Sequence, residues 1–146
     1  MNAKRIMCPV DFSEYSDAAV RYASTLAQES GAKLFLVHVD ESQVPYDAGY
    51  AGFIPQMDPE ALKEKLAEVH PSIATVETEH FMLSGRAADA LVDFANKHDI
   101  DLIVMGTHGR TGVARLLMGS IAEAVVRGAA CPVLTVKLPT QVPAKG

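Results

Sequence analysis

The feature that most constrains the fold is an alternation of apolar runs with helical patterns along the chain. Five apolar runs rich in β-forming residues occupy residues 5–10, 33–39, 75–83, 101–105 and 132–137. Several of them, such as Phe35-Leu36-Val37, are apolar at successive positions. This pattern is typical of parallel strands that helices bury on both faces. The sequence therefore predicts a doubly wound α/β fold with a five-stranded parallel sheet.

Stripes of apolar residues at helical spacing separate the predicted strands, and each stripe can cover one face of the sheet. Ser16 is suited to cap the first helix, and Gly31 is suited to end it. The third helix follows Gly85, and the fourth ends near Gly128. The four stripes consist of Ala19, Ala23, Leu26 and Ala27; Leu62, Leu66 and Val69; Ala88, Leu91, Val92 and Ala95; and Ile121, Ala122 and Val125.

Composition narrows the class of protein further. A chain of 146 residues that is 49% hydrophobic is expected to form one domain, residues 1–146, with a substantial core and a short frayed tail at 139–146. The net charge of -5 and the scattered basic residues disfavour nucleic-acid binding. The apolar segment near the N-terminus is too brief for a signal peptide or a membrane span, so we expect a cytoplasmic protein without a membrane partner.

The cysteines and the strand histidine fit structural roles better than metal or redox chemistry. Cys8 and Cys131 each lie in a strand-like apolar run and form no C-x-x-C pair, so both are expected to be buried reduced thiols. His38 has no second His, Cys or carboxylate at ligand-like spacing, which favours a hydrogen-bonded histidine in the core or at its rim. The sequence therefore predicts no protein metal site.

A glycine-rich segment at residues 105–120, M-G-T-H-G-R-T-G-V-A-R-L-L-M-G-S, connects the fourth predicted strand to the last helix. Phosphates bind at such places because helix-start N–H groups lack partners and glycines let an anion approach closely. Ser120 can cap the helix or donate to a phosphate oxygen. The spacing matches neither a P-loop nor a dinucleotide fingerprint. From spacing alone, a phosphate cradle and simple turn chemistry remain equal alternatives.

Two residues of the glycine-rich segment, and one further segment, have both a functional and a structural interpretation. Arg110 can offer charge-assisted hydrogen bonds to phosphate and His108 can carry a proton, although both residue types are often solvated in loops. The irregular segment at residues 41–58 is long enough to be functional or disordered. Its Tyr46 and Tyr50 can form a lid or fold back on the following helix.

The chain resembles the ATP-binding branch of the universal stress protein family over nearly its whole length. That branch has the nucleotide-binding signature G-x2-G-x9-G-[S/T], which is matched here by Gly106, Gly109, Gly119 and Ser120. The opening Ile6-Met7-Cys8-Pro9-Val10-Asp11-Phe12-Ser13 resembles the family's first strand and turn. Val37-His38-Val39 resembles the end of its second strand, and Ala130-Cys131-Pro132-Val133-Leu134 resembles its ending.

The resemblance implies a Rossmann-like sheet of order 3-2-1-4-5 and a nucleotide site at its edge. In that site Asp11 and the backbone of Val39 would contact adenine, and the glycine loop with Ser120 would hold ribose and phosphates. Pro9, Met105 and Ile121 would line it. The residues themselves allow two roles for Asp11, at the end of the first strand: accepting a hydrogen bond from an exocyclic amine, or capping the helix. Any Mg²⁺ is expected to arrive with the nucleotide, bridging its phosphates.

The last predicted strand falls at a sheet edge in this order, where unpaired backbone groups invite another chain. Its Val133, Leu134 and Val136 are apolar on both faces. Pairing with a second copy about a two-fold axis would protect this edge, and the resemblance also implies a homodimer. We therefore expect a homodimer through residues 132–136.

The leading functional hypothesis is an ATP-binding stress-response module whose nucleotide occupancy biases its own conformation or that of a partner. Little or no turnover is expected because no Gln, Asp or Glu is evident as a water activator. A second hypothesis is a slow ATPase or adenylate hydrolase using His108, Arg110 or Asp11. A third is a nucleotide-free dimeric scaffold, which the intact glycine motif disfavours. ADP and AMP remain alternative ligands.

Overall fold

A computed structural model describes residues 2–42, 58–108 and 118–138 of the chain. Its strands are β1 (Arg5–Pro9), β2 (Lys33–Asp40), β3 (Thr78–Ser84), β4 (Leu102–Gly106) and β5 (Val133–Val136). Its helices are α1 (Glu14–Ser30), α2 (Pro59–Ala67), α3 (Ala87–Lys97) and α4 (Ser120–Gly128). Gly109, Arg110, most of the 41–58 segment with Tyr46 and Tyr50, and the 139–146 tail lie outside the described residues.

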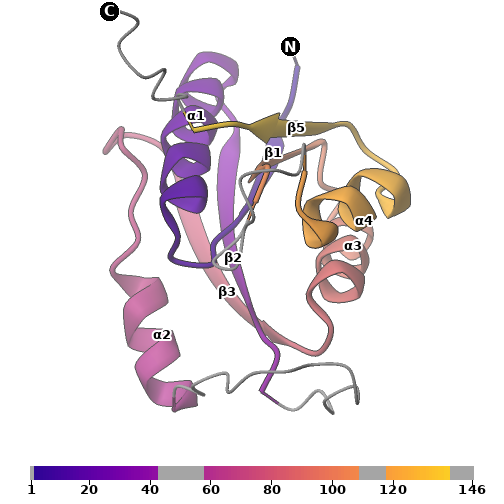
Figure 1. Ribbon diagram of the computed structural model, residues 1–146. Helices are drawn as coiled ribbons and strands as arrows, with labels where there is room; N and C mark the ends of the chain where they lie inside the picture. The colour runs from indigo at the N-terminus through magenta and orange to yellow at the C-terminus, as the bar shows by residue number, and fades with distance from the viewer. Residues whose placement is uncertain (1, 43–57, 109–117, 139–146) are drawn as a thin grey trace, which may run out of the picture.

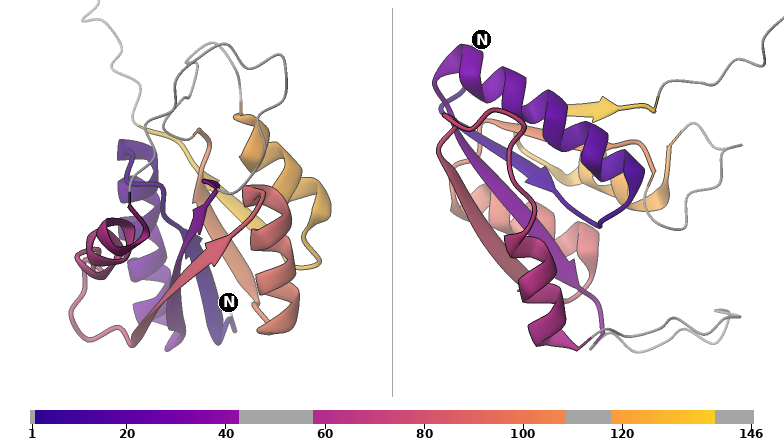
Figure 2. Two further views of the ribbon diagram at one scale, coloured as in Figure 1. Left: turned by 90° about the horizontal axis from the view of Figure 1, so that it is seen from below. Right: turned by 90° about the vertical axis from the view of Figure 1, so that its left-hand side faces the viewer.

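The five strands form one parallel sheet in the order β3-β2-β1-β4-β5, which confirms the predicted fold class and strand order. Helices α1 and α2 pack on one face of this sheet, and α3 and α4 pack on the other (Figures 1 and 2). Strand ends differ from the predicted ranges by at most three residues. The largest difference is β3, which begins at Thr78 because its pairing with β2 starts there.

Two hydrophobic clusters fill the spaces on either side of the sheet. Alternate residues of the central strands enter each cluster, so that Ile6 and Met7 of β1 are both fully buried but on opposite faces. Val125 of α4 is fully buried against the second face. This burial on both faces is the physical reason why the strands are apolar at successive positions.

Helix α1 begins earlier than the sequence suggested. Its N-cap is Ser13, whose extended backbone (φ -86°, ψ 166°) lets the side-chain oxygen accept from the N–H of Ser16. The expectation that Ser16 caps this helix is therefore wrong, and Ser16 is buried within the first turn. Gly31 ends the helix at φ 70° as predicted, because glycine adopts the left-handed conformation without a Cβ penalty.

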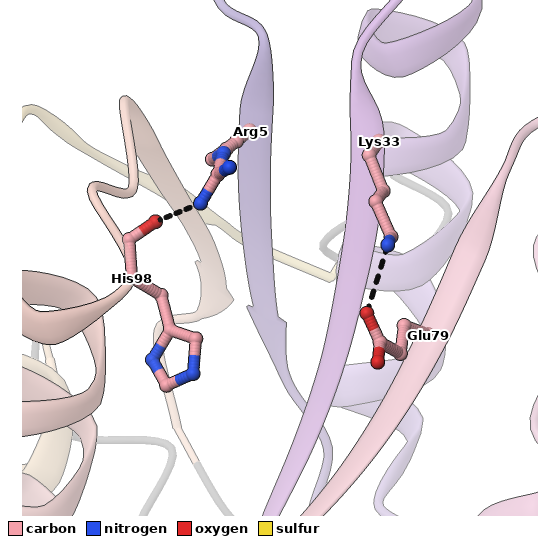
Figure 3. Close-up of polar contacts among 4 residues, drawn as sticks. All are labelled: Arg5, Lys33, Glu79 and His98. Atoms are coloured by element: carbon pink, nitrogen blue, oxygen red, sulfur yellow. Dashed lines mark hydrogen bonds and ion pairs between the residues drawn. The ribbon is translucent and has the colours of Figure 1, made fainter.

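Polar contacts tie together the amino ends of the strands, opposite the carboxyl ends described below. Arg5 Nη1 donates to the carbonyl oxygen of His98 at 2.8 Å, and Lys33 Nζ lies 2.8 Å from Glu79 Oε2 (Figure 3). The hydrogen bond to Glu79 raises the pKa of Lys33. The Asp101 carboxylate also accepts from the backbone N–H groups of Lys4 and Arg5. These contacts fix the strand starts against one another.

The sheet has two edges, β3 and β5, and β5 is half-buried along its length. Cys131 precedes β5 and is only partly buried, which corrects the expectation that its thiol is buried. Cys8 is fully buried in β1 as expected, and burial together with the negative charge of Asp11 raises the pKa of its thiol. No helix among the described residues is both long enough and apolar enough to span a membrane.

Candidate functional site

The sheet topology brings the carboxyl ends of β1, β2 and β4 to the same end of the sheet. Because all strands are parallel, their carboxyl ends face the same way. After β1 the chain crosses to the α1 face, whereas after β4 it crosses to the α4 face. Neighbouring strands whose connections diverge in this way form a topological switch point, where ligands of open α/β sheets bind.

Asp11 lies in the connection between β1 and α1. Since β1 ends at Pro9, Asp11 lies two residues beyond the strand and not at its end as predicted. Its Oδ1 accepts from the N–H of Ser13 at 3.0 Å and from the Ser13 hydroxyl at 2.5 Å. Ser13, not Asp11, is the N-cap of α1, so the carboxylate orients the capping residue. Asp11 is half-buried.

Next to Asp11, Phe12 has a left-handed backbone at φ 67°, which is uncommon for a bulky residue. Its ring lies 4.7 Å from the ring of His38 and 4.7 Å from Lys65 Nζ. The Nδ1 of His38 donates to the carbonyl oxygen of Val10 at 2.6 Å, and His38 is only 8% exposed. This confirms the predicted hydrogen-bonded histidine at the rim of the core.

Gly106, the last residue of β4, has a packing role that the sequence did not reveal. A Cβ at this position would lie 2.7 Å from the Cβ of Tyr15 and 3.0 Å from its backbone carbonyl carbon and oxygen. Real Cβ atoms essentially never approach this closely. We predicted that the missing Cβ leaves room for a phosphate, but the first turn of α1 takes up that space.

The two ends of the glycine-rich segment are held together at Thr107, which is buried. Its carbonyl oxygen accepts from the N–H of Gly119 at 2.6 Å, while its own N–H donates to the carbonyl of Val136 at 3.0 Å. The Thr107 hydroxyl is hydrogen-bonded to Nδ1 of His108 at 3.1 Å. The His108 ring lies 5.2 Å from that of Tyr15. The start of α4 is thereby fixed beside the end of β4.

Among the described residues, no side chain caps the start of helix α4. Its N-cap is Gly119, which gives no side-chain hydrogen bond, and Ser120 is its first residue, at the helix start as predicted. In contrast, Ser13 caps the first turn of α1. The first-turn N–H groups of α4, together with the positive end of its dipole, therefore suit an anion better than those of α1 do.

The other predicted site residues lie around these ends with different exposure. Pro9 and Val39 are half-buried at the ends of β1 and β2, Ser120 is exposed, and Ile121 is 41% exposed. Met105 is buried in the cluster beneath α3 and α4. The structure thus brings Asp11, Pro9 and Val39 to the same carboxyl end of the sheet as Gly106, Gly119 and Ser120.

Three residues near the carboxyl end of the sheet were not singled out from the sequence, namely Tyr15, Phe12 and Lys65. Tyr15 stands four residues before Ala19, in the same helical stripe, so its inward direction was available from spacing. The left-handed conformation of Phe12 and its contact with Lys65 had no comparable signal, because they depend on packing between β2, α2 and the loop after β1.

The strand order and the switch point define a doubly wound α/β protein. A sequence model of the universal stress protein family matches residues 2–137, and the chain belongs to that family. Universal stress protein MJ0531 of Methanocaldococcus jannaschii is 36% identical over 143 residues, covering 93% of this chain and 83% of the relative.

Solved structures of the same family have the same fold. UspA from Lactobacillus plantarum superposes with a TM-score of 0.73 at 24% identity, covering 93% of this chain and 99% of that chain. A universal stress protein in complex with cAMP superposes with a TM-score of 0.70 at 25% identity, covering 95% of this chain and all of that chain.

Proposed function

We propose that this protein binds an adenine nucleotide at the carboxyl ends of β1, β2 and β4, with the phosphates against the start of α4. The observation that carries the proposal is the uncapped first turn of α4, which the hydrogen bond from Gly119 to Thr107 holds beside β4. The relative in complex with cAMP supports an adenine nucleotide as the ligand class. In this site Asp11 and the backbone of Val39 bind the base.

The ligand we favour is ATP with Mg²⁺. Gly109 and Arg110 belong to the same proposed phosphate-binding segment, although both lie outside the described residues. Among the residues that the structure describes, no group of three or more His, Cys, Asp or Glu side chains can hold a metal ion. Mg²⁺ is therefore expected to be coordinated mainly by the phosphates and water, as this ion prefers. ADP and AMP share the base and ribose and are expected to bind the same site.

We infer that the bound nucleotide acts as a signal and is not consumed. Within the described part of the proposed phosphate site, the backbone N–H groups of the first turn of α4 and the Ser120 hydroxyl would hold phosphates, and neither kind of group activates water. Occupancy would then bias the conformation of the protein or of a partner, which is the regulatory role expected of a stress-response module.

Nucleotide titration tests this proposal directly. At about 100 times its dissociation constant, a bound ligand stabilises the native protein by about 2.7 kcal/mol, so ATP, ADP and AMP are each expected to raise the melting temperature. Isothermal titration calorimetry should give saturable heats for the same ligands. Absence of both heat and thermal shift would contradict nucleotide binding. Sustained release of ADP from bound ATP would instead favour a slow ATPase.

We further propose a homodimer through β5, at residues 132–136. Helices α1 and α4 both contact β5, and the large exposed hydrophobic residues in the described part of the chain lie on these two helices: Tyr22, Ile121 and Val126. A half-buried, largely apolar edge strand, contacted by the two helices that carry these exposed apolar side chains, suits pairing with a second copy.

Light scattering should therefore give twice the chain mass of 15.6 kDa at micromolar concentration. Thr135→Lys places a charge on the β5 edge and is expected to shift the protein toward the monomer, because charged side chains block edge pairing. Thr78→Lys on the opposite edge is the matched control, since both threonines are half-buried on edge strands. A monomeric mass for the unaltered protein would refute this interface.

A further inference from the structure

We propose that His38 is a positioning residue that acts through Phe12 to place the Asp11 carboxylate, and that it thereby sets the preference of the site for adenine over guanine. This inference rests on the proposed nucleotide function. It concerns a side chain that does not itself touch the ligand, one residue before Val39 in β2.

A single side chain contacts both sequence neighbours of Asp11. The Nδ1 of His38 donates to the carbonyl of Val10 at 2.6 Å, and its ring packs on that of Phe12 with centroids 4.7 Å apart. The N–H of Val10 also donates to the carbonyl of Val37 at 2.8 Å. Both backbone polar groups of Val10 are therefore hydrogen-bonded to residues of β2. Both sequence neighbours of Asp11 therefore contact β2, Val10 through its backbone and Phe12 through its ring.

The conformation of Phe12 requires this support. At φ 67° its backbone is in the left-handed region, which costs free energy for any residue with a Cβ and persists only where the surroundings hold it. His38 supplies a ring contact, and Lys65 of α2 supplies a cation–π contact at 4.7 Å. The chain reversal at Phe12 is also what lets Asp11 Oδ1 reach the N–H and hydroxyl of Ser13.

Loss of the His38 contacts would let this turn relax toward extended backbone and shift the carboxylate. The carboxylate accepts a hydrogen bond from the exocyclic amine of adenine, whereas guanine offers a carbonyl oxygen at the same ring position. A misplaced carboxylate would lose the adenine contact and lose its repulsion of guanine. The preference for adenine over guanine should therefore fall more than the overall affinity, to which the phosphate contacts contribute.

The test compares dissociation constants for AMP and GMP by isothermal titration calorimetry. Unaltered protein is expected to prefer AMP, and His38→Leu is expected to reduce this preference about tenfold, the scale of one hydrogen bond to a charged group. His38→Asn should restore part of it, because its amide N–H can replace Nδ1 as donor to Val10. Phe12→Leu should reduce the preference as well, since it removes the ring on which His38 acts.

His80→Leu is the matched control, because His80 is also a strand histidine whose ring nitrogen donates to a carbonyl, that of Val69, at 2.7 Å. It should lower stability and leave the AMP-to-GMP ratio unchanged. In the background of Asp11→Ala, His38→Leu should cause no further loss of preference.

An unchanged ratio in His38→Leu, His38→Asn and Phe12→Leu, with AMP binding intact, would overturn the inference and leave the proposed function standing. Failure of the unaltered protein to bind AMP or ATP would overturn both.

Discussion

Gly106→Ala is expected to lower the free energy of unfolding by about 1–3 kcal/mol, the range seen when extra atoms are forced into a packed interior. The added Cβ would lie 2.7 Å from the Tyr15 Cβ and 3.0 Å from Tyr15 backbone atoms. Because backbone takes part in the clash, no rotamer change relieves it, and α1 or β4 must move. Urea unfolding followed by circular dichroism measures the change.

Gly128→Ala is the matched control for this prediction. Its Cβ would meet only side-chain atoms of Val92, Cγ2 at 3.3 Å and Cγ1 at 3.8 Å, and a side-chain atom can give way by a few tenths of an ångström. Its effect on the urea midpoint should be clearly smaller. Equal midpoints for Gly106→Ala and the unaltered protein would show that the close approach of α1 to β4 does not constrain this glycine.

Gly119→Val is expected to remove the stabilisation by nucleotide, about 2.7 kcal/mol at 100 times the dissociation constant, while the protein still folds. Gly119 has φ -70° and ψ 161°, an extended conformation that any residue adopts, so its backbone does not require glycine. A branched side chain at the N-cap would crowd the first-turn N–H groups of α4, where the phosphates are proposed to bind. Thermal shift with and without ATP measures the loss.

Gly119→Ser separates crowding from competition at the same residue. Serine is a preferred N-cap, and its hydroxyl would accept from the α4 N–H groups that the phosphates use. The variant should melt slightly higher without ligand and gain less from ATP than the unaltered protein does. A full ATP-dependent shift in Gly119→Val would place the phosphates elsewhere on the molecule.

The architecture could be predicted because it depends on local pattern. Successive apolar residues in the central strands reported burial on both faces, and the family resemblance supplied the strand order that the structure confirms. Element ends were less accurate because long-range partners decide them. Ser13 and Ser16 both satisfy the sequence rule for an N-cap, and the selection of Ser13 depends on its bonds to Asp11.

The sequence could predict only those site residues whose role depends on their own residue type. Gly119 and Ser120 lie at the start of α4 and Asp11 lies in the connection after β1, and the strand order brings all three to the carboxyl end of the sheet. The requirement for glycine at residue 106 could not be predicted, because it arises from the close packing of Tyr15, which is distant in the sequence. The same holds for the contacts of His38 with the loop after β1, which depend on the pairing of β1 with β2.

The peptide units at Thr107 connect the proposed phosphate site at the start of α4 with the edge strand β5. The N–H of this residue pairs with Val136 in the edge strand, and its carbonyl pairs with Gly119 at the start of α4. In the proposed arrangement, a nucleotide at the start of α4 and a second subunit at β5 would therefore both act on one buried residue. Thermodynamic linkage is reciprocal: whatever factor nucleotide applies to self-association, self-association must apply to nucleotide affinity. If the two proposed sites are coupled through Thr107, the nucleotide affinity of this chain depends on protein concentration.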